Sequence, residues 1–330
     1  MSQVCIRGVG SYLPSARLTN AHIAERFGIT DEHIVRLTGI RERRRAAPEE
    51  ATSDMAIKAA RAALADAGLA HDAVECVIVA TASPDYITPS TANLVQEALH
   101  LPTVPAYDLN AGCTGSLYAL ITAMGLTRAG VCGTALVIGA ELVSRMVNDD
   151  DQETALVFGD GAGALVVQSG AGMSGDLRVL AHSWASDGSM SEVIKVPAGG
   201  SRQPASHQTV GTGEHFLRMN GGRVFRFAVR ALTSLVHEVL ERAGRTLADL
   251  RLLIPHQANW RIIEAAAKKL PLDVANIMVN IDRYGNTSAA SVIVALHEAR
   301  KQGRLQSGDT VVMASFGAGL TWAAVALEVV

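Results

Sequence analysis

The sequence predicts an α/β fold in which a parallel or mixed sheet is buried on both faces. Hydrophobic residues make up 48% of the 330 residues but aromatic residues only 4%, so small aliphatic side chains supply most of the apolar content, as in buried sheets. Short apolar runs alternate with longer amphipathic runs, which is typical of strands joined by helices. A third observation, an internal repeat, indicates two halves of similar topology.

The repeat begins with a helix that is followed by a strand. Residues 54–67 have a helical pattern that ends at Gly68, and an apolar strand follows at 77–80. In the second half the helical pattern covers 224–243, Gly244 ends it, and the strand covers 252–255. Each glycine suits a helix C-terminus, where a positive φ has no steric cost for glycine.

The repeat continues with a strand, a helix and a second strand. In the first half we expect these elements at 106–109, 116–128 and 136–138; in the second half we expect them near 278–281, at 288–301 and at 311–313. We therefore divide the chain into halves 1–172 and 173–330, joined by a glycine-rich loop. Ligand sites of α/β sheets lie beyond the carboxyl ends of strands, so polar residues at those positions are the candidates.

Charge and cysteine content narrow the function classes. The 29 basic and 32 acidic residues give a net charge of −3, which argues against nucleic acid as a partner. No apolar run approaches the ~18 residues of a membrane span, so we expect no membrane partner. The four cysteines contain no Cys-x-x-Cys pair, and the N-terminus is predicted to be a strand rather than a signal peptide, so we expect a cytoplasmic protein.

Three polar residues follow strands at matching places. Cys113 precedes the helix predicted at 116–128, and Asn286 holds nearly the same place in the second half. His256 directly follows the strand that ends at Pro255. If the halves pack around a pseudo-two-fold axis, these three side chains converge. Asn286 alone could merely cap its helix, so it is the coincidence of three positions that favours a site.

The chemistry of this trio suits acyl transfer. A thiol at a helix N-terminus is expected to have a lowered pKa, because the helix dipole stabilises the thiolate. A thiolate attacks thioesters and forms an acyl-enzyme, while His256 and Asn286 can donate two neutral hydrogen bonds to an enolate oxygen. The other cysteines, Cys5, Cys76 and Cys132, are expected to be small core residues.

At these residues the sequence resembles the β-ketoacyl-acyl carrier protein synthase III family of the thiolase superfamily. The resemblance covers essentially the whole chain, and the motifs that carry it are Thr38-Gly-Ile-Arg-Glu-Arg-Arg, Ala111-Gly-Cys-Thr-Gly, Phe158-Gly-Asp-Gly-Ala-Gly-Ala, Pro255-His-Gln-Ala-Asn-Trp-Arg, Gly285-Asn-Thr-Ser-Ala-Ala-Ser and Phe316-Gly-Ala-Gly-Leu-Thr-Trp. It implies a five-layered αβαβα thiolase-like fold, a homodimer, no metal, and no cofactor beyond coenzyme A and phosphopantetheine as substrate carriers. Cys113, His256 and Asn286 match the family's catalytic triad.

The resemblance also implies a reaction and further site residues. An acyl-CoA would acylate Cys113, and malonyl-acyl carrier protein would then lose CO2 and condense to a 3-oxoacyl product that initiates fatty-acid or related synthesis. The family pattern assigns an oxyanion role to the backbone N–H groups of Cys113 and Ala318, carrier or coenzyme A binding to Arg226, Arg261, Asn259 and Ala258, and the acyl pocket to Thr88 and Phe316.

Several positions depart from the family pattern and keep alternatives open. His33 stands where many members have a tryptophan that stacks on adenine, and Leu37 and Gln152 stand where arginines commonly contact the nucleotide. These departures favour, as an alternative, an acyltransferase of specialised metabolism with a different donor or acceptor. Weaker alternatives are a nucleotide-binding oxidoreductase, from the glycine-rich run at 159–163, and a non-catalytic partner subunit, which the intact trio disfavours.

Overall fold

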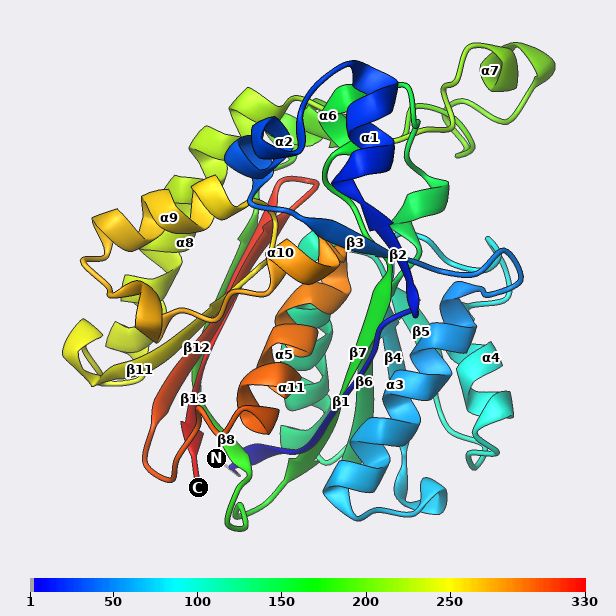
Figure 1. The fold of residues 1–330 in the computed structure, drawn as a ribbon. Coiled ribbons are helices and arrows are strands. Elements are labelled where there is room, and N and C mark those ends of the chain that lie inside the picture. Colours follow the sequence, from blue (N-terminus) through cyan, green and yellow to red (C-terminus); the bar gives the residue numbers. More distant parts are fainter. Residues whose placement is uncertain (1–2) are drawn as a thin grey trace.

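The computed structural model describes residues 3–330 and has one large mixed sheet, whose two groups of strands lie on either side of two central helices (Figure 1). Nine strands form this sheet in the spatial order β11-β12-β13-β8-β1-β7-β6-β4-β5. Two small two-stranded sheets, β2–β3 and β9–β10, lie outside it. The strands are β1 (Val4–Tyr12), β2 (Ala16–Thr19), β3 (Glu42–Arg45), β4 (Cys76–Ala80), β5 (Ala106–Leu109), β6 (Thr134–Glu141), β7 (Gly161–Ser169), β8 (Leu177–Ser186), β9 (Ile194–Lys195), β10 (Arg218–Met219), β11 (Leu250–Pro255), β12 (Thr310–Gly317) and β13 (Thr321–Val329).

The order of the strands repeats on either side of the central β1–β8 pair. From β1 outward the strands are β7, β6, β4 and β5, and from β8 outward they are β13, β12 and β11. On both sides the outer strands pair in parallel and the inner ones antiparallel. This repeated strand order is the one expected for two halves of similar topology. The exact division of the chain at residue 172 stays a prediction.

One predicted strand is wrong. The chain near 278–281 forms only a single parallel bridge, between Leu253 and Ile277, and then enters a short helix. The physical reason is the side chain of Gln257, whose amide donates to the Met278 carbonyl over 3.0 Å and accepts from the Asn280 N–H over 3.0 Å. This amide supplies the hydrogen bonds that a neighbouring strand would have supplied.

Helices complete five alternating layers (Figure 1). α3 and α4 cover the outer face of the first group of strands, α5 and α11 lie between the two groups, and α8 and α9 cover the outer face of the second. The predicted helices correspond to α3, α5, α8 and α11. The helices are α1 (Asn20–Phe27), α2 (Asp31–Thr38), α3 (Thr52–Ala67), α4 (Thr91–Ala98), α5 (Gly115–Arg128), α6 (Gln152–Ala155), α7 (His207–Gly211), α8 (Gly221–Arg242), α9 (Trp260–Lys269), α10 (Ile281–Tyr284) and α11 (Ser291–Lys301).

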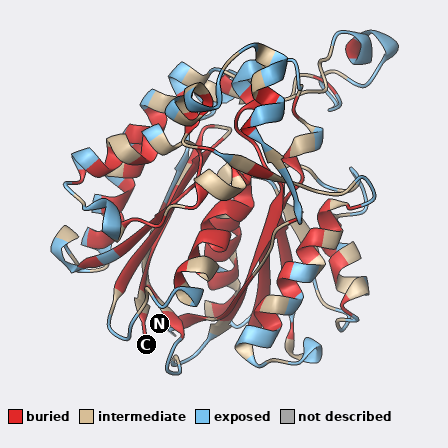
Figure 2. Ribbon diagram, in the orientation of Figure 1, coloured by how far each residue is buried: buried red, intermediate tan, exposed pale blue. Residues whose placement is uncertain are grey.

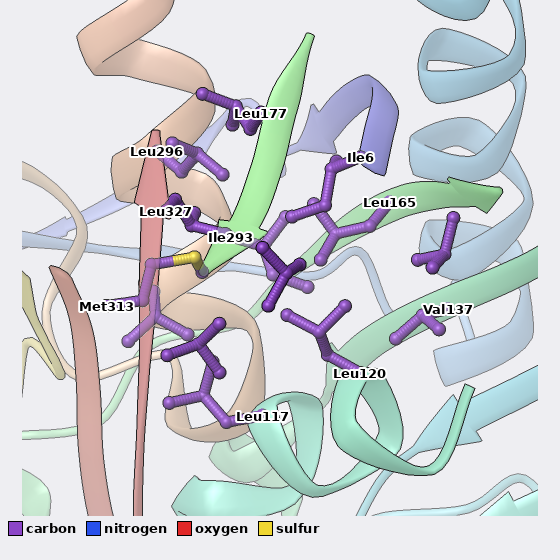
Figure 3. Packing of buried hydrophobic residues seen from close by; sticks show 14 of the residues in the cluster. Ile6, Leu117, Leu120, Val137, Leu165, Leu177, Ile293, Leu296, Met313 and Leu327 are labelled. Atoms are coloured by element: carbon purple, nitrogen blue, oxygen red, sulfur yellow. The ribbon is translucent and has the colours of Figure 1, made fainter. Parts of the chain in front are cut away.

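The two central helices hold the largest core. Leu117 and Leu120 of α5 and Ile293 and Leu296 of α11 meet side chains from strands on both sides (Figure 3). These helices are buried nearly all round, whereas the outer helices expose one face (Figure 2). The three cysteines predicted as core residues, Cys5, Cys76 and Cys132, are indeed buried. No helix within residues 3–330 combines the length and the apolar character that crossing a membrane requires.

The tight contact between β1 and α3 gives a stability prediction. A Cβ added at Gly10 would lie 2.3 Å from the backbone nitrogen of Ala63 and 2.4 Å from the carbonyl oxygen of Ala59. Gly10→Ala is therefore expected to lower the free energy of unfolding by about 1–3 kcal/mol, because the strand and helix must move apart. Chemical denaturation measures this change.

Gly125 provides the matched control, because it lies within α5 and a Cβ added there meets nothing within 4 Å. Gly125→Ala should raise the free energy of unfolding by roughly 0.5–1 kcal/mol through the loss of backbone freedom in the unfolded chain. Equal effects of the two substitutions would contradict the packing described here.

Candidate active site

One cavity is lined by Cys113, His256 and Asn286 together. The empty space within it amounts to about 980 Å³, part of which is open to solvent. Its walls are otherwise mostly apolar, and β6, α8, β12 and the loops beside them supply much of the lining. The structure therefore brings together three side chains that are far apart in the sequence.

Cys113 lies on a single 3₁₀ turn, Gly112–Thr114, that leads directly into α5. Gly112 has a φ of 54°, and a Cβ added to it would lie 3.0 Å from the backbone nitrogen of Ala318. A Cβ at Gly317 would lie 2.7 Å from the backbone nitrogen of Cys113. Glycines at both places let the backbones of the Cys113 turn and the Ala318 loop lie against each other, as a shared backbone oxyanion site requires.

The expected lowering of the Cys113 pKa is wrong for this structure. Burial raises the pKa of the thiol to about 11, and the nearby Glu141 raises it further, while a hydrogen bond from Ser288 acts in the opposite direction. The thiol opens onto the cavity, but protein groups packed around it remove most of the water that would solvate a thiolate. Position at a helix N-terminus alone therefore does not ionise this cysteine.

His256 is held as a neutral ring. Its backbone N–H donates to the Ala314 carbonyl over 2.7 Å, its Nδ1 lies 2.6 Å from Ser291 Oγ, and the ring meets the edge of Phe316 at a centroid distance of 5.3 Å. Burial lowers the pKa of His256 to about 3. With Nδ1 engaged by Ser291, Nε2 is the nitrogen left to serve a ligand.

The orientation of the Asn286 amide is fixed by its neighbour. Asn286 Oδ1 accepts the backbone N–H of Ser288 over 2.8 Å, and because that N–H can only donate, the amide nitrogen is the group left for the cavity. The Asn286 backbone bonds Val157 and Gly159 over 2.9 and 3.0 Å. Asn286 thus offers the cavity a neutral donor, and His256 offers a second one in the tautomer that carries its proton on Nε2 and accepts from Ser291 at Nδ1.

Sequence reasoning missed three side chains of the site. Glu141 is fully buried at the end of β6, and burial raises its pKa. Ser288 contacts both Glu141 and Cys113, and Ser291 contacts His256. One signal was available for Glu141: it is the only charged residue of its strand. Both serines lie in the segment around Asn286 that already resembled a family motif.

A second, more open pocket adjoins the cavity. The two linings share five residues, Val157, Met219, Gly221, Phe225 and Asn259. Arg226 and Arg261 line this outer pocket with exposed side chains, and Leu37 and Gln152, two of the departures noted above, line it as well. The outer pocket therefore has two cationic side chains at its rim. Where the family pattern has further arginines, it has the apolar Leu37 and the amide of Gln152.

The remaining predicted site residues are placed as follows. Asn259 lines both pockets, but its side chain caps α9 and donates to the Leu37 carbonyl over 3.1 Å. Ala258 and Phe316 line the inner cavity. Thr88 does not line it: within one chain Thr88 lies exposed on the loop between β4 and α4. His33, on α2, lies outside both linings and is 2.9 Å from Arg36.

The glycine-rich run at 159–163 leads into β7 rather than into a helix. A dinucleotide fingerprint needs a helix N-terminus directly after its glycines, where the pyrophosphate binds. The oxidoreductase alternative therefore has no structural support.

Comparisons with known proteins agree on one family. The family described as "3-Oxoacyl-[acyl-carrier-protein (ACP)] synthase III" matches residues 107–188, and its C-terminal counterpart matches residues 240–329. A β-ketoacyl-[acyl-carrier-protein] synthase III of Symbiobacterium thermophilum is 47% identical over 98% of both chains. One of Clostridioides difficile is 46% identical over 97% of this chain and 96% of the relative.

Solved structures show the same likeness. The 3-oxoacyl-[acyl-carrier-protein] synthase III of Aquifex aeolicus superposes with a TM-score of 0.89 at 41% identity and covers 98% of this chain and 99% of its own. That of Pseudomonas aeruginosa has a TM-score of 0.90 at 38% identity and covers 99% and 98%. The predicted fold class is therefore confirmed.

Proposed function

The chain belongs to the β-ketoacyl-[acyl-carrier-protein] synthase III family, and we propose that it condenses an acyl-CoA with malonyl-acyl carrier protein to a 3-oxoacyl-carrier product that initiates fatty-acid synthesis. Coenzyme A and phosphopantetheine carry the substrates, and the reaction uses no further cofactor and no metal. The observation that supports this most directly is a nucleophilic thiol that shares one cavity with two neutral hydrogen-bond donors.

In the first step, the Cys113 sulfur attacks the thioester carbonyl of the acyl-CoA, and coenzyme A leaves as the thiol. The backbone N–H groups of Cys113 and Ala318 hold the oxyanion that forms during the attack. Glycines at 112 and 317 let their two loops pack closely against each other, and backbone donors of this kind stabilise an oxyanion by about 3 kcal/mol each. The apolar wall beside Cys113, which includes Phe316, takes the acyl chain.

In the second step, the malonyl group is placed beside the acylated Cys113. His256 and the Asn286 amide donate hydrogen bonds to its thioester carbonyl and stabilise the enolate that forms as CO2 leaves. Neither group is a strong base, since His256 has a pKa of about 3 and an amide does not titrate. Loss of CO2 forms the carbanion without a base, which is why this pair suits decarboxylation. The carbanion then attacks the acyl carbon and releases Cys113.

A product assay tests this function. Purified protein is mixed with acetyl-CoA or a longer acyl-CoA and with malonyl-acyl carrier protein, and the carrier is analysed by mass spectrometry. We expect a 3-oxoacyl-carrier product, released CO2 and one free coenzyme A for each turnover. Turnover with a different acceptor but not with malonyl-carrier would favour the specialised-metabolism alternative, which the names of the curated relatives do not favour.

Carrier recognition is assigned to the exposed arginines of the outer pocket, Arg226 and Arg261. An acidic carrier with a phosphopantetheine phosphate is attracted by cations at the mouth. Arg226→Glu or Arg261→Glu should lower kcat/KM for malonyl-carrier by roughly tenfold, about 1.4 kcal/mol, and the loss should shrink at high salt. Steady-state kinetics at two salt concentrations measures this.

Arg242→Glu is the matched control, because Arg242 ends the same helix about 24 Å from Arg226 at 1.5 Å per residue. It should leave kcat/KM unchanged. An equal loss of kcat/KM in Arg242→Glu and Arg226→Glu would show that the carrier responds to the net charge of the protein and not to the arginines of the outer pocket.

We also propose a homodimer in the cytoplasm. β5 is an edge strand that pairs only with β4 among the described residues, and open edges of this kind are usually covered. On the loop between β4 and α4, Tyr86 and Ile87 are 59% and 93% exposed, as expected of side chains that a second copy covers. Light scattering should give twice the mass of the chain. The four free cysteines suit a reducing compartment.

A further inference from the structure

A short chain of hydrogen bonds leads from the Cys113 thiol to the Glu141 carboxyl group. Ser288 Oγ lies 3.4 Å from Cys113 Sγ and 3.0 Å from Glu141 Oε1. Ser288 Oγ lies in donor geometry toward both groups. Because a serine hydroxyl has one proton and two acceptor sites, a Ser288 that gives its proton to the carboxylate is left to accept from the thiol. Ser288 is placed there by a backbone φ of 48°, a left-handed conformation that non-glycine residues rarely adopt.

The other oxygen of Glu141 is fully occupied by donors. Ser83 Oγ lies 2.7 Å from Oε2, and the backbone N–H of Ala82 lies 3.1 Å from it. Because Ser83 Oγ also accepts the N–H of Leu142 over 2.8 Å, its own proton is directed to Glu141. Oε1 is the oxygen that faces Ser288, so a proton from that hydroxyl would arrive there.

The surroundings of Glu141 favour its taking up a proton. It is 0% exposed, and within residues 3–330 no cation forms an ion pair with it. Burial without a compensating cation disfavours the charged form of a carboxyl group. It is the main cause of the raised pKa of Glu141, which hydrogen bonds from Ser83, Ala82, Ser288 and Ala289 partly offset. The only ionisable side chains among those lining the cavity are Cys113, His256 and Glu141.

Acylation of Cys113 requires that a proton leave the sulfur. The thiol does not ionise by itself near pH 7, since its pKa is about 11. His256 is a poor acceptor, since its pKa is about 3 and its Nδ1 is engaged by Ser291. Of the ionisable groups in the cavity lining, Glu141 remains, and it is linked to the sulfur through a single hydroxyl group.

We propose that Glu141 accepts the thiol proton of Cys113 through Ser288 during attack on the acyl thioester. The S–H bond of Cys113 breaks as the sulfur bonds to the acyl carbon, Ser288 takes up that proton, and Ser288 passes its own proton to Glu141 Oε1. When the acyl carbon–sulfur bond to coenzyme A breaks, the proton returns from Glu141 through Ser288 to the departing sulfur, so coenzyme A leaves as the thiol. Glu141 thus acts on the Cys113 sulfur only through the Ser288 hydroxyl, so we class it as a positioning residue. This inference rests on the proposed acyl transfer.

The test is the single-turnover rate at which acetyl-CoA acylates Cys113 in Glu141→Gln. We expect a rate roughly 100-fold lower than in the wild type at pH 7, the size of a lost general base. The wild-type rate should rise with pH as Glu141 ionises. The variant should lack this rise and should accelerate only at higher pH, where Cys113 ionises by itself.

A purely electrostatic or structural role makes the opposite prediction. The negative charge of Glu141 disfavours a Cys113 thiolate, so without a relay Glu141→Gln would acylate as fast as the wild type or faster. Either result would overturn the proposal. If Glu141→Gln fails to fold, Ser288→Ala tests the same link with the carboxyl group retained, and it should show the same loss and the same change in pH profile. The double variant should be no slower than either single variant, because both remove one pathway.

Two controls separate the outcomes. Asp160→Asn makes the same change of acid to amide at another fully buried carboxyl group, one that binds Ala46 and Ser144 outside the cavity, and it should acylate at the wild-type rate. Decarboxylation of malonyl-carrier by Asp160→Asn should also match the wild-type rate. If the wild-type protein is not acylated by any acyl-CoA, the proposed function fails; if it is acylated and Glu141→Gln is acylated equally fast, only the relay fails.

Discussion

Cys113→Ala is expected to abolish both the acyl adduct and condensation. Intact-mass analysis after incubation with acyl-CoA should show an added acyl group on the wild-type chain and none on the variant. The physical reason is that covalent catalysis depends on this one sulfur, the only thiol in the cavity lining. The loss of turnover should exceed about a thousandfold, because loss of a nucleophile removes an entire pathway.

Cys132→Ala provides the control for this prediction. Cys132 is also a free cysteine but is buried in the core, so its replacement should cost some stability and leave the adduct in place. An adduct that persists in Cys113→Ala and disappears in Cys132→Ala would place the nucleophile elsewhere and would contradict the assignment.

His256→Ala and Asn286→Ala should each slow decarboxylation of malonyl-carrier by roughly 100- to 1000-fold, equivalent to about 3–4 kcal/mol of lost stabilisation of the enolate. Acylation of Cys113 should be much less affected, since its oxyanion is held by backbone groups instead. Release of CO2 from labelled malonyl-carrier measures the first effect, and intact mass measures the second.

His297→Ala is a matched control, because His297 lies on α11 outside the cavity lining and is 2.7 Å from Ser11 Oγ. It should decarboxylate at the wild-type rate. Because burial holds the pKa of His256 near 3, the decarboxylation rate should also show no titration of this ring between pH 5 and 8. A break near pH 6.5 would indicate a solvated histidine and would contradict the neutral-donor role.

Local patterns predicted most of the fold. The glycine that ends α3 has the expected left-handed φ of 63°, and Gly244, just after α8, has a φ of 65°; the alternation of helix and strand was visible because buried strands are nearly all apolar. The strand predicted near 278–281 failed for a non-local reason. The amide of Gln257 replaces a strand neighbour, and no pattern of hydrophobic residues records that.

The catalytic residues were partly predictable, because local patterns along the chain also mark where functional side chains lie. Cys113 and His256 could be singled out because each follows a strand. Asn286 could be singled out because it holds nearly the same place in the second half as Cys113 holds in the first, although the strand predicted before it does not form. Glu141 and Ser288 were missed, because their role depends on a contact between side chains 147 residues apart. The Cys113 pKa was predicted in the wrong direction, since the helix position can be read from the sequence but the desolvation around the sulfur cannot.

The central claim is that one cavity performs two separable steps, thiol acylation and then decarboxylative condensation. The most direct measurement isolates His256→Ala carrying an acyl group on Cys113, adds malonyl-carrier, and follows the adduct by intact mass. We predict that the wild-type protein transfers its acyl group from Cys113 within the time of one turnover, as a 3-oxoacyl-carrier appears. The acyl group on His256→Ala should form and then persist. Discharge of both adducts at equal rates, with the same product, would contradict the claim.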